Sequence, residues 1–224
     1  MTDDLGGLIS AVLAKGFAFR EELSAAASTE ELAHALGEPI AFSGNSPVHT
    51  LTPKSTIEAS SNTYSGNYGL GEFPLHTDMA NWHEPPRYLM LRCVVGSRDV
   101  ATTVVDLEPV AKSIGIENLT RALMKPRRRV AGRIGILPLA QPFHDGMIFR
   151  WDQRYLQPAS RAGEVYAREF SERLREATII PFALAQPGDT VVIDNWKMLH
   201  GRAAVPESNH SRRIERVYLR TLRQ

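Results

Sequence analysis

The sequence of 224 residues has a single cysteine, Cys93, and therefore cannot form an intramolecular disulfide. Cys93 lies in an apolar run with the character of a strand, so we expect a buried and unreactive thiol. A chain without disulfides suits a reducing compartment, and we expect the protein to be cytoplasmic.

The sequence also lacks a large excess of basic or acidic residues, and it lacks a long apolar run. The 26 basic and 25 acidic residues give a formal net charge of +1, which offers no general attraction for nucleic acid or for an anionic membrane. We interpret the one basic run, residues 125–129 (KPRRR), as a solvated surface. No apolar stretch reaches the roughly 18 residues that a membrane helix needs. The acidic Asp3 and Asp4 differ from the basic start of a secretory signal, which we therefore do not expect.

What the sequence does contain is many short strand-like segments between glycine and proline turns, with 43% hydrophobic residues overall. This pattern predicts one domain, residues 1–224, that is mainly β with flanking α: a jelly roll with added helices. The predicted strands are residues 17–19, 48–52, 88–95, 101–107, 130–137, 147–151, 178–183, 190–193 and 213–222. The predicted helices are residues 5–15, a segment capped by Ser28 and Glu31 and ended by Gly37, residues 107–124, and a segment capped by Ser160. Residues 1–40 would form a helical flank on the outside of the barrel.

A long segment without periodicity, residues 54–72, is rich in Ser, Asn, Gly and Tyr. A loop of this length is unusual in a compact domain and is often functional. Because it leads directly into the motif described next, we expect an active-site lid. A mobile surface loop is the alternative.

The motif is His76-Thr77-Asp78, with His200 far downstream. Residues i and i+2 of an extended segment point to the same side, so His76 and Asp78 can hold one ion while Thr77 points away. Two imidazoles and one carboxylate on one face of a metal leave three positions open, as in non-heme Fe(II) oxygenases. A chance triplet among seven histidines and 25 acidic residues is the alternative. Of the other histidines, only His83 is a candidate neighbour of the site.

The order of the surrounding motifs is more specific than the triplet. Residues 73–78 (FPLHTD) and 85–93 (PPRYLMLRC) are followed downstream by 188–195 (GDTVVIDN) and 199–202 (LHGR). Over roughly residues 40 to 222, this order resembles the iron(II)/2-oxoglutarate-dependent oxygenases of the taurine dioxygenase and clavaminate synthase-like group. The resemblance implies a double-stranded β-helix (jelly roll, cupin-like) with flanking helices.

The same resemblance implies an oxidoreductase. Fe(II) would be held by His76, Asp78 and His200, with 2-oxoglutarate and O2 as co-substrates. The reaction would oxidise, most often hydroxylate, a C–H bond of a small polar molecule such as an amino acid or other small acid, releasing succinate and CO2. Related halogenating enzymes lack the carboxylate ligand, so the presence of Asp78 predicts oxidation rather than chlorination.

The co-substrate would be held by an arginine and a threonine. The guanidinium fork suits the C5 carboxylate of 2-oxoglutarate, and in the family this arginine follows the second histidine by about a dozen residues. Arg212 is twelve residues after His200, with Arg213 as the rival. Arg212, Ile214 and Arg216 would share one face of a strand, which favours Arg212. The family threonine falls at Thr103, with Thr102 as the off-by-one alternative.

Two arginines are candidates for binding the substrate. Arg216 matches the family position that faces the substrate's acid group, although a protein carboxylate, Asp152 or Asp194, could pair with it instead. Arg150 and Asp152, on one face of the predicted strand that ends near them, are further candidates, with a structural salt bridge between the two as the alternative. The expected partner of the protein is thus a small molecule, and no motif bears on its oligomeric state.

Two other functions fit some of these features. One is a hydrolase or isomerase that uses the same ligands with Zn(II) or Mn(II), since a fold does not fix a function. The other is a non-catalytic jelly-roll binding protein. Succinate release coupled to O2 uptake would exclude the first, and iron-dependent binding of 2-oxoglutarate would argue against the second.

Overall fold

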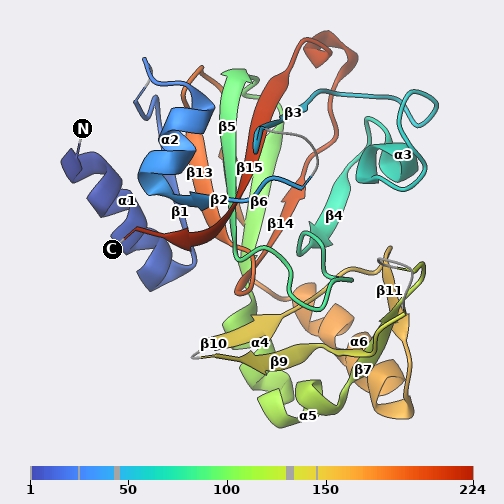
Figure 1. Cartoon of the computed structure of the whole chain (residues 1–224). Helices are drawn as coiled ribbons and strands as arrows, with labels where there is room; N and C mark the ends of the chain where they lie inside the picture. Colours follow the sequence, from blue (N-terminus) through green and yellow to red (C-terminus); the bar gives the residue numbers. More distant parts are fainter. Residues whose placement is uncertain (1, 25, 43–45, 130–133, 145, 224) are drawn as a thin grey trace.

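Two antiparallel sheets form the centre of the computed structural model, which describes residues 2–24, 26–42, 46–129, 134–144 and 146–223 (Figure 1). The larger sheet has the strand order β1 (Phe17–Arg20), β13 (Thr190–Asp194), β5 (Tyr88–Val95), β15 (Arg213–Leu222) and β2 (Gly37–Pro39), with β3 (His49–Leu51) also paired to β15. The smaller sheet has the order β12 (Ile180–Ala183), β6 (Ala101–Asp106), β14 (Met198–Arg202) and β4 (Phe73–His76).

Strand β5 shows how the layers are built, because its side chains alternate between two cores. Leu89 and Cys93 belong to an apolar cluster that also contains Val104 of β6 and Met198 of β14, so this core lies between the sheets. Tyr88 and Met90 belong to a second cluster on the other face of β5. The prediction of a strand buried on both faces is confirmed, and so is the jelly roll of two packed sheets.

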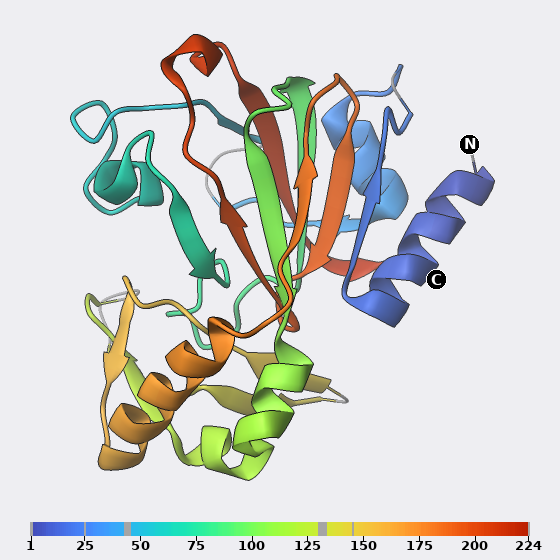
Figure 2. The ribbon, with the colours of Figure 1, turned by 180° about the vertical axis from the view of Figure 1, so that it is seen from behind.

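The second cluster is completed by the N-terminal helices, α1 (Thr2–Lys15) and α2 (Thr29–Leu36), which lie against the outer face of the larger sheet (Figures 1 and 2). Leu8 and Val12 of α1 and Leu32 and Leu36 of α2 are all buried there. The predicted helical flank on the outside of the barrel is therefore present, with β1 and β2 following the two helices.

A separate layer lies at one end of the sheets, at the bottom of Figure 1, and is formed by the segment between β6 and β12. Its apolar cluster includes Leu119, Trp151 and Phe170. The helices are α4 (Leu107–Ile114), α5 (Ile116–Arg121) and α6 (Arg161–Leu174). The strands are β7 (Leu123–Pro126), β8 (Leu137–Pro138), β9 (Ala140–Phe143), β10 (Gly146–Phe149) and β11 (Leu156–Pro158).

Some predicted elements differ from those observed. The single helix expected over 107–124 is broken at Gly115, whose φ of 95° is not helical. The segment 54–72 contains one short helix, α3 (Tyr64–Tyr68), which Thr63 caps. Of the strand expected over 130–137, residues 130–133 lie outside the described residues, and of the rest only Leu137 is in a strand. A short 3-10 helix, Glu207–Asn209, precedes β15.

Two expectations from the amino-acid composition can be compared with the structure. Cys93 is buried, its thiol donates to the carbonyl of Leu184, and burial raises its pKa to about 11, so the thiol is unreactive as expected. Within the described part of the chain, no helix combines the length and the apolar character needed to cross a bilayer.

Helix α6 supplies a test of the fold. Its N-cap, Ser160, is extended (φ −146°, ψ 164°), and its hydroxyl accepts a hydrogen bond from the backbone N–H of Gly163. A Ser160→Ala variant loses this cap and should lower the free energy of unfolding by about 1 kcal/mol, measured by chemical denaturation. Ser160→Asp keeps an acceptor at a helix N-terminus and should recover most of the loss. An equal loss in both variants would contradict the capping role.

Candidate metal centre

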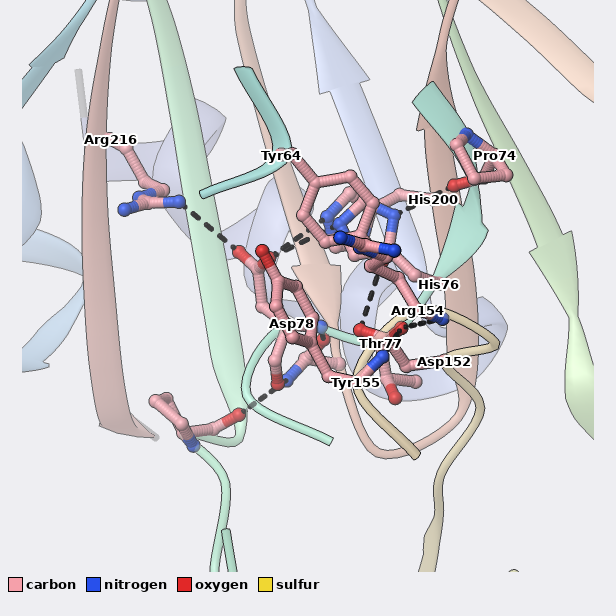
Figure 3. A network of polar contacts seen from close by, with 12 residues as sticks. Tyr64, Pro74, His76, Thr77, Asp78, Asp152, Arg154, Tyr155, His200 and Arg216 are labelled. Carbon is pink, nitrogen blue, oxygen red and sulfur yellow. Dashed lines mark hydrogen bonds and ion pairs between the residues drawn. The ribbon is translucent and has the colours of Figure 1, made fainter. Parts of the chain in front are cut away.

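The three predicted metal ligands meet at one point of the structure (Figure 3). The pairing of β14 with β4 places His200 directly opposite His76, and Asp78 follows two residues after the end of β4. Their ligand atoms all lie within 4.8 Å of one another. Oδ1 of Asp78 lies 3.3 Å from Nε2 of His76 and 3.6 Å from Nε2 of His200. Neighbouring ligands on an ion with bonds of ~2.1 Å are about 3 Å apart, so this spacing fits a metal ion.

The hydrogen bonds around His76 prepare its ring for a metal. Its Nδ1 lies 2.8 Å from the carbonyl oxygen of Pro74, an acceptor that requires the proton to be on Nδ1. Nε2 faces Asp78 and, in the neutral ring, is the nitrogen free to bind a metal, which is the arrangement of a metal-ligating histidine with an ordered outer contact. Two imidazoles and one carboxylate, without a thiolate, are a donor set suited to Fe(II).

Asp78 is held as a carboxylate by the charges around it. Burial opposes its charged form, but His200, His76 and Arg216 hold the pKa of this carboxyl well below its usual range. Oδ2 accepts a hydrogen bond from the Tyr218 hydroxyl at 2.6 Å and lies 3.6 Å from Nη1 of Arg216. The group is therefore ready to bind a cation without first losing a proton.

The backbone of Asp78 is fixed by Asn195, which is completely buried. The Asn195 side chain accepts from the Asp78 N–H at 2.8 Å and donates to the Asp78 carbonyl at 3.0 Å and to the Pro86 carbonyl at 2.9 Å. Thr77 points away from the metal ligands, as predicted, and its hydroxyl accepts from the backbone N–H of Trp151. The sequence motif contained Asn195, but nothing in the motif assigned it a role in the site.

The metal ligands open into a cavity of about 610 Å³, a volume typical of small-molecule sites. Arg212 also lines it, and this side chain is buried, with a residue exposure of 8%. Its Nε has no hydrogen-bond partner among the described residues, and burial lowers the pKa of its guanidinium. A buried guanidinium with unused donors is costly, so this position favours a bound anion.

Strand β15 has the predicted register on this side of the cavity. Arg212, Ile214 and Arg216 all line the cavity, while Arg213 is exposed. The ion-pair partner of Arg216 is Asp78, and neither carboxylate suggested by the sequence takes that place. Asp194, for example, pairs with Arg87 at 3.6 Å.

The structure places Thr102, the off-by-one alternative, in the cavity lining instead of Thr103, the residue predicted to bind the co-substrate. In the pairing of β6 with β14, Thr102 lies opposite Arg202 and Thr103 lies opposite Gly201. Thr102 and Arg202 are on the face that carries His200, and Thr102 lines the cavity whereas Thr103 does not. A shift of one residue along a strand moves a side chain to the opposite face of the sheet, which explains the difference.

The structure also does not place Arg150, a predicted substrate-binding residue, in the cavity lining. Arg150 is fully buried outside the cavity lining, beyond the end of β10. Its guanidinium donates to the carbonyls of Ala80, Trp82 and His83 and to the Gln141 side chain. It makes no ion pair with Asp152 among the described residues. Arg150 thus supports the loop that follows Asp78. The exposed His83 does not line the cavity either and contributes only its backbone carbonyl.

Two further residues, Tyr64 and Asp152, line the cavity; Asp152 was a candidate from the sequence, whereas Tyr64 was not identified from it. The Tyr64 ring, from α3, stacks on the imidazole of His76 with centroids 4.0 Å apart, and its hydroxyl donates to Asp152 at 2.9 Å. The segment 54–72 therefore lies over the metal ligands. Its tyrosines gave no sequence signal, because the segment has no periodicity.

The far end of this segment is fixed by Arg202, two residues after His200. The Arg202 guanidinium donates to the carbonyls of Gly69 and Gly71 and lies 3.6 Å from the ring centroid of Phe73. Burial, together with the charge of Arg212, lowers the pKa of Arg202 to about 10. Arg202 is thus a cavity residue whose Nε and Nη2 already donate to backbone carbonyls.

The clamp on Asp78 gives a test of the metal centre. Asn195→Ala removes all three hydrogen bonds that hold Asp78 and its neighbouring loop, so Fe(II) affinity should fall by roughly ten- to a hundredfold. Anaerobic titration calorimetry measures this affinity. Asn118→Ala, which removes a side-chain hydrogen bond to Ile114 on helix α4, is the matched control and should leave Fe(II) affinity unchanged. Unaltered Fe(II) affinity in Asn195→Ala would show that the clamp is not needed.

Comparisons with known proteins give no match to a family model and no match to a curated protein. Solved structures do match. An asparagine oxygenase in complex with Fe(II), 2S,3S-3-hydroxyasparagine and succinate is 18% identical, with a TM-score of 0.72 over 97% of this chain and 78% of that one. The non-heme iron oxygenase OrfP, in complex with Fe and α-ketoglutaric acid (2-oxoglutaric acid), is 18% identical, with a TM-score of 0.75 over 98% of this chain and 80% of that one.

A third similar structure is PvcB from Pseudomonas aeruginosa, at 19% identity and a TM-score of 0.69 over 96% of this chain and 79% of that one. PvcB is described as an Fe, α-ketoglutarate-dependent oxygenase. At these identities the likeness concerns the fold, and it agrees with the two packed sheets described above. The chain thus has the jelly-roll fold found in solved oxygenases that use iron and α-ketoglutarate.

Proposed function

We propose that this chain is an Fe(II)- and 2-oxoglutarate-dependent dioxygenase that hydroxylates a C–H bond of a small polar molecule, releasing succinate and CO2. One observation carries the proposal: the triad of His76, Asp78 and His200 opens into the same cavity as Arg212, a buried guanidinium with an unused donor. A metal-dependent hydrolase or isomerase would need the triad but not a buried anion site beside it.

The roles of these residues follow from their positions. The two imidazoles and Asp78 would hold Fe(II) on one face and leave the opposite face open to ligands. Bound iron and 2-oxoglutarate supply the oxidising chemistry, for which protein side chains have no equivalent. Arg212 would bind the C5 carboxylate of 2-oxoglutarate through paired hydrogen bonds. Thr102, on the same face of the smaller sheet as His200, replaces Thr103 as the candidate hydroxyl beside it.

Arg216 is our candidate for binding an acid group of the substrate. It lines the cavity beside the triad, and its Nε has no partner among the described residues. At present its Nη1 lies near Asp78. A metal ion would take over much of the negative charge of Asp78, which would leave Arg216 in need of another anion.

The segment 54–72 is our candidate for the lid. Seven of its residues line the cavity, and Tyr64 lies directly on a metal ligand. In that place the segment would exclude water from the metal, as lids do in many enzymes. We further propose that residues 1–224 act as one domain in the cytoplasm, the compartment that the single cysteine favours.

An amino acid is the substrate class that the similar structures favour. The asparagine oxygenase complex contains hydroxyasparagine, and an OrfP complex contains (3S)-hydroxy-L-Arg, each with succinate. A free amino acid is small and polar, and it carries the acid group that Arg216 would bind.

Loss of the carboxylate ligand tests the iron site. In Asp78→Ala, the visible charge-transfer band of the Fe(II)–2-oxoglutarate complex should be absent under anaerobic conditions, and succinate formation in air should fall to background. The exposed Asp99 offers a matched control, and Asp99→Ala should retain both signals. Wild-type succinate formation by Asp78→Ala would refute the assignment.

The co-substrate site is tested by a pair of neighbouring arginines. Arg212→Ala removes charge-assisted hydrogen bonds that contribute about 1.5–3 kcal/mol each, so the dissociation constant for 2-oxoglutarate should rise roughly tenfold or more. Titration of the charge-transfer band measures this constant. Arg213→Ala, at the exposed next position, should leave it unchanged. If Arg213→Ala showed the loss and Arg212→Ala did not, our assignment of the carboxylate partner would be wrong.

A further inference from the structure

Asp152 is a buried carboxylate that faces the metal cavity. It is 4% exposed and lines the cavity together with the metal ligands. Oδ1 accepts from the backbone N–H groups of Arg154 and Tyr155, at 2.7 and 2.8 Å, and Oδ2 accepts from the Tyr64 hydroxyl at 2.9 Å. These three bonds fix the orientation of the carboxylate and leave Oδ2 with acceptor capacity to spare.

Within the described ranges, no basic side chain forms an ion pair with this carboxylate. Among the described residues, no Lys, Arg or His nitrogen lies within 4.0 Å of Asp152. Arg150, two residues away, points to the carbonyls of the loop at 80–83, and the side chain of Arg154 is exposed. Burial raises the pKa of Asp152, against the opposing attraction of His76. A buried carboxylate in this state gains most from a ligand that brings its own positive charge.

The other charges around the cavity already have partners once the proposed co-factors are bound. Fe(II) and Arg212 together carry three positive charges, which balance Asp78 and the two carboxylates of 2-oxoglutarate. Arg202 already donates from Nε and Nη2 to backbone carbonyls. Lys54 also lines the cavity but is exposed to solvent. Of the less exposed charges, Arg216 and Asp152 remain, and Figure 3 shows them on opposite sides of Asp78. A cavity with one positive group, Arg216, and one negative group, Asp152, on either side of the metal ligands has the charges needed to bind a zwitterion.

We propose that Asp152 is the specificity-determining residue of the cavity and binds a cationic group of the substrate, an ammonium or a guanidinium, while Arg216 binds its carboxylate. The inference rests on the proposed function and narrows it: the substrate is a zwitterionic amino acid rather than a simple acid. Tyr64 then has a second task, because its hydroxyl orients the Asp152 oxygen that receives the cation.

The test is binding to the anaerobic Fe(II)–2-oxoglutarate form of the protein, measured by calorimetry. Two kinds of matched ligand pair are used: L-arginine against the nearly isosteric neutral L-citrulline, and L-amino acids against the corresponding 2-hydroxy acids. In the wild type, at least one pair should favour the cationic member by roughly tenfold or more, the value of one charge-assisted hydrogen bond. Absence of any such preference in both kinds of pair would overturn the proposal without any variant.

Variants then assign the preference to one side chain. Asp152→Asn is similar in size and keeps an oxygen for the two backbone N–H groups, but it removes the charge, so the preference should shrink to roughly twofold or less. Tyr64→Phe is the matched control: it removes the neighbouring hydroxyl while the carboxylate stays, so the sign of the preference should persist. A preference that survives intact in Asp152→Asn would refute the assignment.

The outcome can be separated from that of the proposed function. The charge-transfer band of Fe(II) and 2-oxoglutarate should form in Asp152→Asn as in the wild type, because Asp152 contacts neither the iron nor the co-substrate in this scheme. A wild-type protein that forms no band refutes the dioxygenase. A wild-type protein that forms the band but shows no cation preference refutes only the role of Asp152.

Discussion

The candidate site depends first on the antiparallel pairing of β14 with β4, which sets His200 opposite His76. Strand β14 is itself paired to β6 on its other side, so one histidine comes from an inner strand and the other from the edge of the smaller sheet. The ladder of backbone hydrogen bonds fixes the distance between them. Asp78 lies beyond the end of β4 and has no such ladder, which is why the side chain of Asn195 holds its backbone instead.

The strongest electrostatic interactions of the site involve the third metal ligand, Asp78. Asp78 is close to two imidazoles and one guanidinium and accepts from a tyrosine hydroxyl, all in a mostly buried setting. A carboxylate in such surroundings is stabilised as an anion, and the neighbouring groups are positioned by their attraction to it. The same attraction brings Arg216 into the cavity. The metal ligands and the candidate substrate residue are therefore parts of one charge arrangement.

The sequence allowed prediction where a strong period or an ordered set of motifs was present. The histidines and Asp78 were identified from their motifs, and the alternation along β15 placed Arg212 and Arg216 on one face and Arg213 on the other. The prediction was less accurate where only the number of residues between two positions was used and no alternation along a strand supported it. Thr103 was chosen by spacing alone, and spacing cannot decide between the two faces of a strand.

Other features depend on contacts that no local pattern encodes. Arg150 was taken as a site residue because its segment looked extended, yet β10 ends at Phe149 and the guanidinium turns to carbonyls of the loop at 80–83. Tyr64 lies in a segment without periodicity, and its place over His76 results from packing between parts of the chain that are distant in sequence. Whether a cation lies beside Asp152 likewise depends on the directions in which the Arg150 and Arg154 side chains point, and no local pattern encodes these directions.

The residues that line the cavity come from two kinds of chain segment: the strands of the two sheets, and connecting segments such as the layer between β6 and β12. The metal ligands, Arg212 and Arg216 belong to the sheets or directly adjoin them, whereas Asp152 comes from that intervening segment and Tyr64 from the segment 54–72. A jelly roll tolerates changes in length and sequence in such connecting segments far better than in its paired strands. Residues that would select the substrate could therefore be exchanged over evolutionary time, or in the laboratory, while the iron-binding core stays the same.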